Sequence, residues 1–384
     1  ARGDANRDTL YWPAQQRMAV TELMDFQTTM DMAWYADRPG GWIFHCHLNF
    51  HVVRNPAIGA AMEPDSVRIR EVISGISARD STPMAGMKEH DMAAMGGLML
   101  RMDITPSAAW HPYAGPRERL HLYIRSDSVS GDTLRRFGYA LSGAGAPPPD
   151  SLRWPGPPII LHVGQPTSIM VVNQTPEASQ VHWHGLELNS YYDGVAGISN
   201  SGDMVAPMIA PRDSFEMTAT PPRAGSFMYH THINDVRQQS HGLYGALIVL
   251  PKGANWDPST DLIFMVGTDP LDDPILNGSA SPPALALVAG KTYRIRLMNL
   301  TLDAPYAEFS LTNSKGAVPL WTALAKDGYD RPAWQKTSVH ARQRVSIGET
   351  YDFALKQLTP GDYAMEMRGL SGKMYARQVI HVAP

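Results

Sequence analysis

The chain contains a single cysteine, and histidines stand on both sides of it. Residues 42–51 read WIFHCHLNFH, so Cys46 lies between His45 and His47, and His51 follows. A thiolate and imidazoles are the donors of blue-copper sites, which add a second histidine and a weak axial ligand. Because alternate residues of an extended segment face opposite sides, we expect His45 and His47 to point away from Cys46 and to bind other metal ions. A small buried cysteine beside structural histidines would also fit these residues.

Two further pairs of histidines have the same spacing. Residues 181–185 read VHWHG and residues 227–232 read FMYHTH. Histidines at positions i and i+2 of an extended segment share one face, and imidazole is a common copper ligand. One such pair is easily explained as two surface histidines on a strand, but three pairs, one of them around the lone cysteine, predict copper binding. The six imidazoles belong to His45, His47, His182, His184, His230 and His232.

These motifs and their order resemble the multicopper oxidases, the laccase-like family. Five segments are similar to that family's trinuclear-site cupredoxin domain: 154–164, 182–185, 191–198, 224–232 and 242–250. Residues 38–51 are similar to the end of its blue-copper domain, so the resemblance covers nearly the whole chain. It implies that His182 binds the type 2 copper and that Cys46 and His51 bind the type 1 copper. It assigns the type 3 copper pair to His184, His230, His232, His45 and His47.

The family's HPxHxHG motif does not occur in this sequence. In the family this motif lies upstream of the HCH motif and supplies one histidine to each of the three site types. The chain opens with ARGDANRDTLYW, which is similar to the continuation just after it. We therefore expect a fragment, or one product of a longer chain, with six of the eight trinuclear ligands and one of the two type 1 histidines. The missing ligands would come from an upstream segment or from another subunit.

The axial ligand of the type 1 copper is a second departure from the family. The family usually has Met or Leu about five residues after the last histidine, where this sequence has Pro56, which cannot ligate. Residues 94–104 (AMGGLMLRMDI) resemble the family's closing strand. We predict Met95 as the axial ligand, with Met62 and Met92 as alternatives, because thioether sulfur is a soft donor. A type 1 site without an axial ligand is the remaining alternative.

The resemblance implies an oxidase. The type 1 copper would take single electrons from a reducing substrate, and Cys46, which is covalently continuous with His45 and His47, would connect it to the cluster that reduces O2 to water. Asp193 in YYDG resembles a family aspartate that helps proton supply, although a turn aspartate before glycine would read the same. We expect a laccase-like enzyme that oxidises phenolic or aromatic donors and is periplasmic or secreted.

Two other functions fit the same residues. Six of the 21 methionines fall at 84–102, around His90. Thioethers bind Cu(I) well, so the enzyme would instead oxidise metal ions such as Cu(I) or Mn(II), whereas apolar packing would also explain these methionines. Without the HPxHxHG histidines, a non-catalytic copper-binding or electron-transfer fragment is the third hypothesis.

The elements that hold these motifs are predicted to be β-strands. The chain has 32 glycines, 31 prolines and only 18% charged residues. Short apolar or alternating runs are separated by turn residues, and no helical pattern is long enough for a parallel α/β sheet. This favours an all-β fold of tandem cupredoxin-like Greek-key β-sandwiches. Strands are expected at 120–124, 159–163, 168–172, 246–250, 262–266, 293–298 and 351–355.

Turn-rich segments at 105–118 and 251–260 separate three expected domains. By resemblance, residues 1–105 are the C-terminal part of a blue-copper cupredoxin domain and residues 106–257 carry the trinuclear-site ligands. Residues 258–384 resemble the family's cupredoxin-like domain without copper ligands. The HCH domain comes first here, whereas the common three-domain order puts it last.

Composition restricts the partners. One cysteine permits no intrachain disulfide, and no apolar run has membrane-spanning length. A net charge of −4 argues against a nucleic-acid partner. The expected partners are O2 and a small reducing substrate. We expect no metal binding from His241, His340 and His381, because they have no paired spacing.

Overall fold

The computed structural model describes the chain in thirteen stretches: residues 3–4, 9–10, 12, 16–24, 28–48, 98–106, 113–127, 136–143, 152–233, 235–269, 273–302, 304–356 and 358–384. Nearly all regular structure in these stretches is β-strand, so the predicted all-β class is confirmed. The described helical segments are short: η2 (Ser190–Tyr192), α5 (Asp235–Gln238) and η3 (Ala333–Gln335). No described helix is long and apolar enough to cross a membrane.

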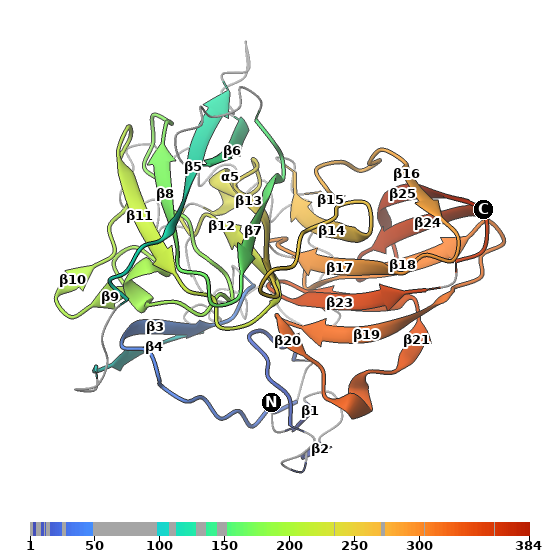
Figure 1. Cartoon of the computed structure of the whole chain (residues 1–384), viewed down its shortest axis with the longest axis horizontal. Coiled ribbons are helices and arrows are strands. Elements are labelled where there is room, and N and C mark those ends of the chain that lie inside the picture. The colour runs from blue at the N-terminus through green and yellow to red at the C-terminus, as the bar shows by residue number, and fades with distance from the viewer. Residues whose placement is uncertain are drawn as a thin grey trace, which may run out of the picture.

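Two sheets form the N-terminal sandwich, on the left in Figure 1. The four-stranded sheet has the order β11 (Ser214–Ala219), β8 (Thr167–Asn173), β5 (Glu118–Asp127), β6 (Arg136–Gly143). The three-stranded sheet has the order β12 (Gly225–His230), β13 (Tyr244–Leu250), β7 (Gly156–His162). Inward-facing side chains of both sheets, such as Leu122, Ile159 and Leu247, form one core. Alternation along each strand puts these side chains on the inner face.

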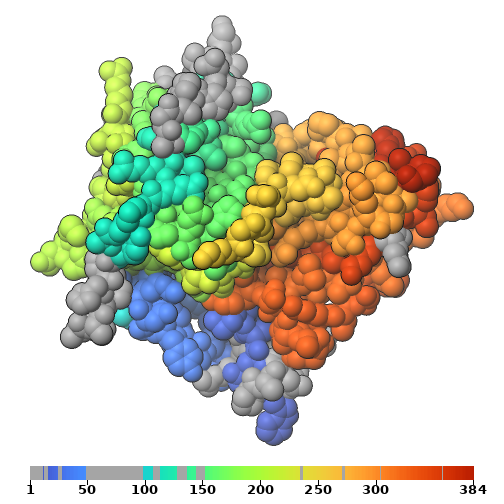
Figure 2. Space-filling model, in the orientation of Figure 1, coloured from blue at the N-terminus to red at the C-terminus, as the bar shows by residue number. Residues whose placement is uncertain are grey.

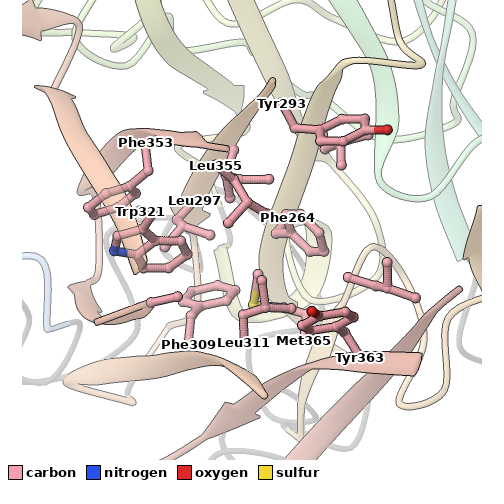
Figure 3. Packing of buried hydrophobic residues seen from close by; sticks show 14 of the residues in the cluster. Phe264, Tyr293, Leu297, Phe309, Leu311, Trp321, Phe353, Leu355, Tyr363 and Met365 are labelled. Atoms are coloured by element: carbon pink, nitrogen blue, oxygen red, sulfur yellow. The ribbon is translucent and has the colours of Figure 1, made fainter. Parts of the chain in front are cut away.

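Two more sheets form the C-terminal sandwich, on the right in Figure 1. The first has the order β15 (Pro274–Leu276), β14 (Asp261–Thr268), β17 (Tyr293–Asn299), β23 (Thr350–Leu355), β19 (Leu320–Lys326), β20 (Tyr329–Asp330), and β21 (Ser338–His340) also pairs with β19. The second has the order β16 (Leu285–Val288), β25 (Met374–Ala383), β24 (Gly361–Arg368), β18 (Tyr306–Asn313), β22 (Arg342–Ser346). The core between them combines aliphatic and aromatic side chains, and Trp321 stacks on Phe353 there with ring centroids 4.1 Å apart (Figure 3).

Strand β13 explains how the two sandwiches adhere. All seven of its residues are buried. Leu247 and Val249 face the core of the N-terminal sandwich, whereas Ala246 and Ile248 pack in a second cluster with Met265 and other residues of the C-terminal sandwich. A strand covered on both faces reads as a continuous apolar run, which is how YGALIVL appears in the sequence.

The HCH motif lies on a two-stranded sheet of its own, β3 (Gly40–His45) paired antiparallel with β4 (Met99–Ile104). β4 falls within the segment 94–104 that resembles a closing strand. The minor strand pairs are β1 (Gly3–Asp4) with β2 (Thr9–Leu10), and β9 (Asn200–Ser201) with β10 (Met204–Val205). Figure 2 shows the blue N-terminal segment along the lower side of both sandwiches.

Strand β3 is docked on the N-terminal sandwich through two glycines. Gly41 donates its N–H to Asn200 Oδ1 at 3.1 Å, and Ser190 Oγ donates to the carbonyl of Gly41 at 2.5 Å. A Cβ at Gly40, where φ is +115°, would lie 2.3 Å from the carbonyl oxygen of Asn200, and a Cβ at Gly41 would lie 2.4 Å from that of Ile198. Only glycine permits this approach, which places the HCH motif against the N-terminal sandwich.

Six of the seven predicted strands fall within observed ones, in β5, β8, β13, β14, β17 and β23, and the seventh, 159–163, extends one residue beyond the end of β7 at His162. The two sandwich cores lie within 122–249 and 262–382. The domain boundaries at 105/106 and 257/258 stay predictions.

A buried ionic cluster crosses between the sandwiches. Asp352 of β23 accepts a hydrogen bond from Ser226 Oγ of β12 at 2.6 Å, and it pairs with Arg294 at 2.5 Å and Arg296 at 3.2 Å. Burial raises the pKa of Asp352, but the two guanidinium groups outweigh it, so the pKa lies below its ordinary value. The carboxylate is therefore ionised and fully compensated.

Replacing Asp352 with Asn should lower the free energy of unfolding by up to about 3 kcal/mol, because it removes the buried carboxylate that Arg294 and Arg296 share, while Arg296 keeps its pair with Asp261. Urea denaturation at neutral pH measures this change. Asp362→Asn is the matched control, since Asp362 pairs with His381 on the surface and should matter little. Equal unfolding midpoints for the two variants would contradict the prediction.

Candidate metal centre

The HWH and HTH pairs lie side by side because their strands bridge. His182 donates its N–H to the carbonyl of His230 at 2.7 Å, and His230 returns the bond to the carbonyl of His182 at 3.1 Å. His230 ends strand β12, and His232 follows two residues later. The docked strand β3 brings His45 and His47 to the same place, so all three motifs meet there.

Five of the six imidazoles form a closed circuit of ring contacts, and the sixth, that of His182, contacts three of them. The consecutive centroid distances are 4.9 Å for His45–His47, 5.1 Å for His47–His184, 5.8 Å for His184–His230, 5.8 Å for His230–His232 and 5.6 Å for His232–His45. The ring of His182 is 5.4–5.6 Å from those of His184, His230 and His232. One nitrogen from each of His182, His184 and His230 lies within 4.8 Å of the others, as a shared metal ion would require.

Backbone carbonyls set which ring nitrogen faces the cluster. Because a carbonyl only accepts, the ring nitrogen bonded to it carries the hydrogen and the other nitrogen keeps its lone pair. Nδ1 is the bonded nitrogen in four rings: His45 to Cys46 O (2.8 Å), His47 to Ile347 O (2.9 Å), His182 to Asp193 O (2.8 Å) and His230 to Thr231 O (2.6 Å).

His184 is bonded through the opposite nitrogen, from Nε2 to the carbonyl of Gly348 at 2.9 Å. The lone pairs therefore lie on Nε2 of four rings and on Nδ1 of His184. Nε2 of His230 is buried and has no hydrogen-bond partner among the described residues. Burying such an atom costs free energy unless something binds it, so the donor set fits a metal.

Burial also keeps the imidazoles neutral. It lowers the pKa of His47, His182 and His232 to about 4, with further lowering from neighbouring histidines. The pKa values of His184 and His230 fall well below the ordinary value for the same reasons. Only a neutral imidazole can bind a metal, so the cluster needs no deprotonation at neutral pH.

Asp193 lies against this cluster. Its carbonyl orients His182, and its Oδ1 is 3.6 Å from His182 Nδ1. Burial raises the pKa of Asp193 to about 7, although His232 and His45 act to lower it. The next residue is Gly194 at φ +83°, where a Cβ would overlap the carbonyl oxygen of Val181. A carboxyl group whose pKa is close to neutral pH can take up or release a proton beside the histidines.

Cys46 is half-buried, and its N–H donates to the carbonyl of Leu98 at 3.0 Å. Burial raises the pKa of its thiol, while the backbone N–H groups of Leu48 and His47 act in the opposite direction. The other predicted type 1 ligands, His51 and Met95, lie outside the described residues, as do the alternatives Met62 and Met92.

The carbonyls of Ile347 and Gly348 were missed by sequence reasoning. Every residue has a carbonyl, so no residue type marks these two, and they come from the domain expected to lack ligands. The three histidines from which we expected no metal binding are His241, His340 and His381. His241 is buried with Nδ1 2.9 Å from Ser240 Oγ, His340 is exposed on β21, and His381 bonds Asp362 at 2.7 Å.

Comparison with known proteins points in one direction. Two sequence models described as multicopper oxidase match residues 152–254 and 2–65. Laccase-2 of Botryotinia fuckeliana is 27% identical over 247 residues, which cover 55% of this chain and 39% of that protein. Copper resistance protein A of Escherichia coli is 34% identical over 95 residues, covering 25% of this chain and 14% of that protein. The chain thus spans less than half of these relatives.

Among solved structures, a blue copper oxidase from Nitrosomonas europaea matches with a TM-score of 0.53 and 21% identity, covering 69% of this chain and 86% of that one. A multi-copper oxidase from Pseudomonas thermotolerans matches with a TM-score of 0.53 and 19% identity, covering 70% and 64%. These likenesses support the predicted tandem cupredoxin-like fold.

The metal-free chain should lose stability as the pH falls from about 6.5 to about 4. His47, His182 and His232 titrate near pH 4 when folded, whereas an unfolded histidine titrates near about 6.5. The unfolded chain binds more protons in this window, so acid favours unfolding, by up to about 1 kcal/mol per pH unit for each histidine.

Urea denaturation of metal-free protein at several pH values measures that slope. His232→Gln should reduce it by one histidine's share, and His381→Gln, at an exposed site, should leave it unchanged. An identical slope for wild type and His232→Gln would be incompatible with a buried neutral cluster.

Proposed function

The chain belongs to the multicopper oxidase family, and we propose that it couples one-electron oxidation of phenolic or aromatic donors to the four-electron reduction of O2 to water. The observation that carries the proposal is the cluster of six imidazoles in ring contact from three HxH motifs, of which His184 and His230 are buried and the other four are half-buried. Membership of the family supports copper as the metal. The names of several relatives, laccases among them, support a phenolic donor.

The proposed ligands follow the motifs. His182 would hold the type 2 copper, and Cys46, His51 and Met95 would hold the type 1 copper. The type 3 pair would be held by His184, His230, His232, His45 and His47. When bound, copper supplies the redox chemistry and the binding of O2.

The chain's own residues prepare this chemistry. Carbonyl groups hold the rings in one orientation, and burial keeps bulk water from the imidazoles and leaves them neutral. The backbone joins Cys46 directly to His45 and His47, which gives the two proposed sites a short covalent connection. Asp193, whose pKa is about 7, would hold or release a proton at its carboxylate beside His182 as O2 is converted to water.

The copper ligands that this sequence lacks, and the location of the protein, are also part of the proposal. Histidines for a full set of sites would come from an upstream segment or from another subunit. Copper oxidases of this kind are expected in the periplasm or outside the cell, and we propose the same location here.

A metal-ion oxidase is the second candidate. Its support is the similarity to copper resistance protein A over 95 residues, together with the methionines at 84–102. Oxidation of Cu(I) and of a phenolic donor can be compared directly on one preparation. Deleting residues 84–93 should reduce activity only if the donor is a metal ion.

Copper-loaded protein should consume O2 with a phenolic donor and release no peroxide. Copper content by atomic absorption and O2 uptake with an oxygen electrode measure this on the native assembly. His232→Gln should lose copper and O2 uptake because it removes a proposed type 3 ligand, whereas His381→Gln should keep both. Copper content unaffected by His232→Gln, or no O2 uptake with either donor, would refute the proposal.

A further inference from the structure

We propose that the turn 347–349 of the C-terminal sandwich is a positioning element of the metal centre, through which a domain without predicted ligands controls metal affinity. The inference rests on the proposed function in taking copper as the metal. The turn joins β22 to β23, and its backbone contacts His47 and His184 of the histidine cluster.

Two consecutive carbonyls of this turn orient two histidines from different motifs. Ile347 O accepts from Nδ1 of His47, and Gly348 O accepts from Nε2 of His184, both at 2.9 Å. The two rings are 5.1 Å apart and inclined by 66°. The turn therefore selects opposite tautomers, with the lone pair on Nε2 of His47 and on Nδ1 of His184. Without these acceptors, either ring could present an N–H to the metal instead.

Residue 348 must be glycine for two separate reasons. Its φ is +81°, which side chains other than glycine rarely adopt. A Cβ on Gly348 would also lie 2.0 Å from Nδ1 of His47 and 3.1 Å from Cε1 of His184. The backbone thus approaches both rings more closely than any side chain would allow.

The turn is itself held from behind. Gly348 donates to the carbonyl of Asn299 at 2.8 Å, and Asn299 donates to the carbonyl of Glu349 at 3.2 Å. Glu349 Oε2 accepts from the N–H of Ser346 at 2.8 Å, and its Oε1 lies 3.0 Å from the ammonium group of Lys326. All these groups are buried. The two carbonyls are therefore fixed in place before any metal arrives.

Lys326 and Asp327, which lie beside Glu349, also bind the segment 16–24. Lys326 lies 3.0 Å from Asp327 and 3.3 Å from Glu22. Asp327 accepts from the N–H groups of Val20 and Thr21, both at 3.0 Å. Chain from before the HCH motif and chain from the C-terminal sandwich thus meet behind the turn, which couples their packing to the orientation of His47 and His184.

Gly348→Ala tests the inference. The added methyl should displace His47 or His184 and weaken Cu²⁺ binding by about 10–100-fold, the range for lost partners of ligand histidines. Competition with a chromophoric chelator measures the affinity, and the electron paramagnetic resonance spectrum of bound Cu²⁺ should change its hyperfine splitting. Gly290→Ala is the matched control, because Gly290 has φ +76° and no atom within 4 Å of its Cβ position. It carries the same backbone strain but should bind Cu²⁺ like the wild type.

Equal Cu²⁺ affinity for Gly348→Ala and Gly290→Ala would overturn the inference. If circular dichroism shows that Gly348→Ala is unfolded, Glu349→Gln decides, since it weakens the pair with Lys326 and leaves the space around the rings unchanged. It should reduce Cu²⁺ affinity by about tenfold, and wild-type affinity would overturn the inference. A wild type that binds Cu²⁺ but consumes no O2 would refute only the proposed function.

Discussion

Imidazole rings buried against one another constrain everything else in this structure. A buried ring nitrogen without a partner is costly, and a buried imidazolium is costlier still. Backbone carbonyls satisfy one nitrogen in each of His45, His47, His182, His184 and His230 and leave the other directed at the cluster. The low pKa values of His47, His182, His184 and His230 follow from the same burial. The site is neutral and rich in lone pairs because of its surroundings.

The rings are held in place by backbone segments that approach their neighbours closely at glycine residues. At Gly40 and Gly41 the HCH strand touches the N-terminal sandwich where no side chain would fit, and at Gly348 the C-terminal sandwich does the same to the rings. Buried ion clusters around Asp352 and Lys326 hold these parts in register. The metal centre therefore depends on contacts among all three parts of the chain. A domain without predicted ligands takes part through its carbonyl groups.

Much of this arrangement could be predicted from residue types. Pairs at i and i+2 predicted that each HxH motif presents two rings on one face, and the apolar runs predicted strands that the structure contains. The resemblance to the family predicted that Asp193 lies near the metal centre, and its carboxylate does lie beside His182. The roles of Ile347 and Gly348 were not predictable, because a carbonyl carries no side-chain signature. His51 and Met95 stay predictions, since they lie outside the described residues.

By itself, the sequence determined the chemistry available here: one thiol, six paired imidazoles, and the period-two pattern that keeps each pair together on a strand. Those properties are local, because they depend on residue identity and on neighbours two positions away. Only the tertiary structure decided that the three pairs converge, which ring nitrogen each presents, and how far each pKa moves. These depend on burial and on acceptors as distant in sequence as Ile347 is from His47, which no local pattern encodes.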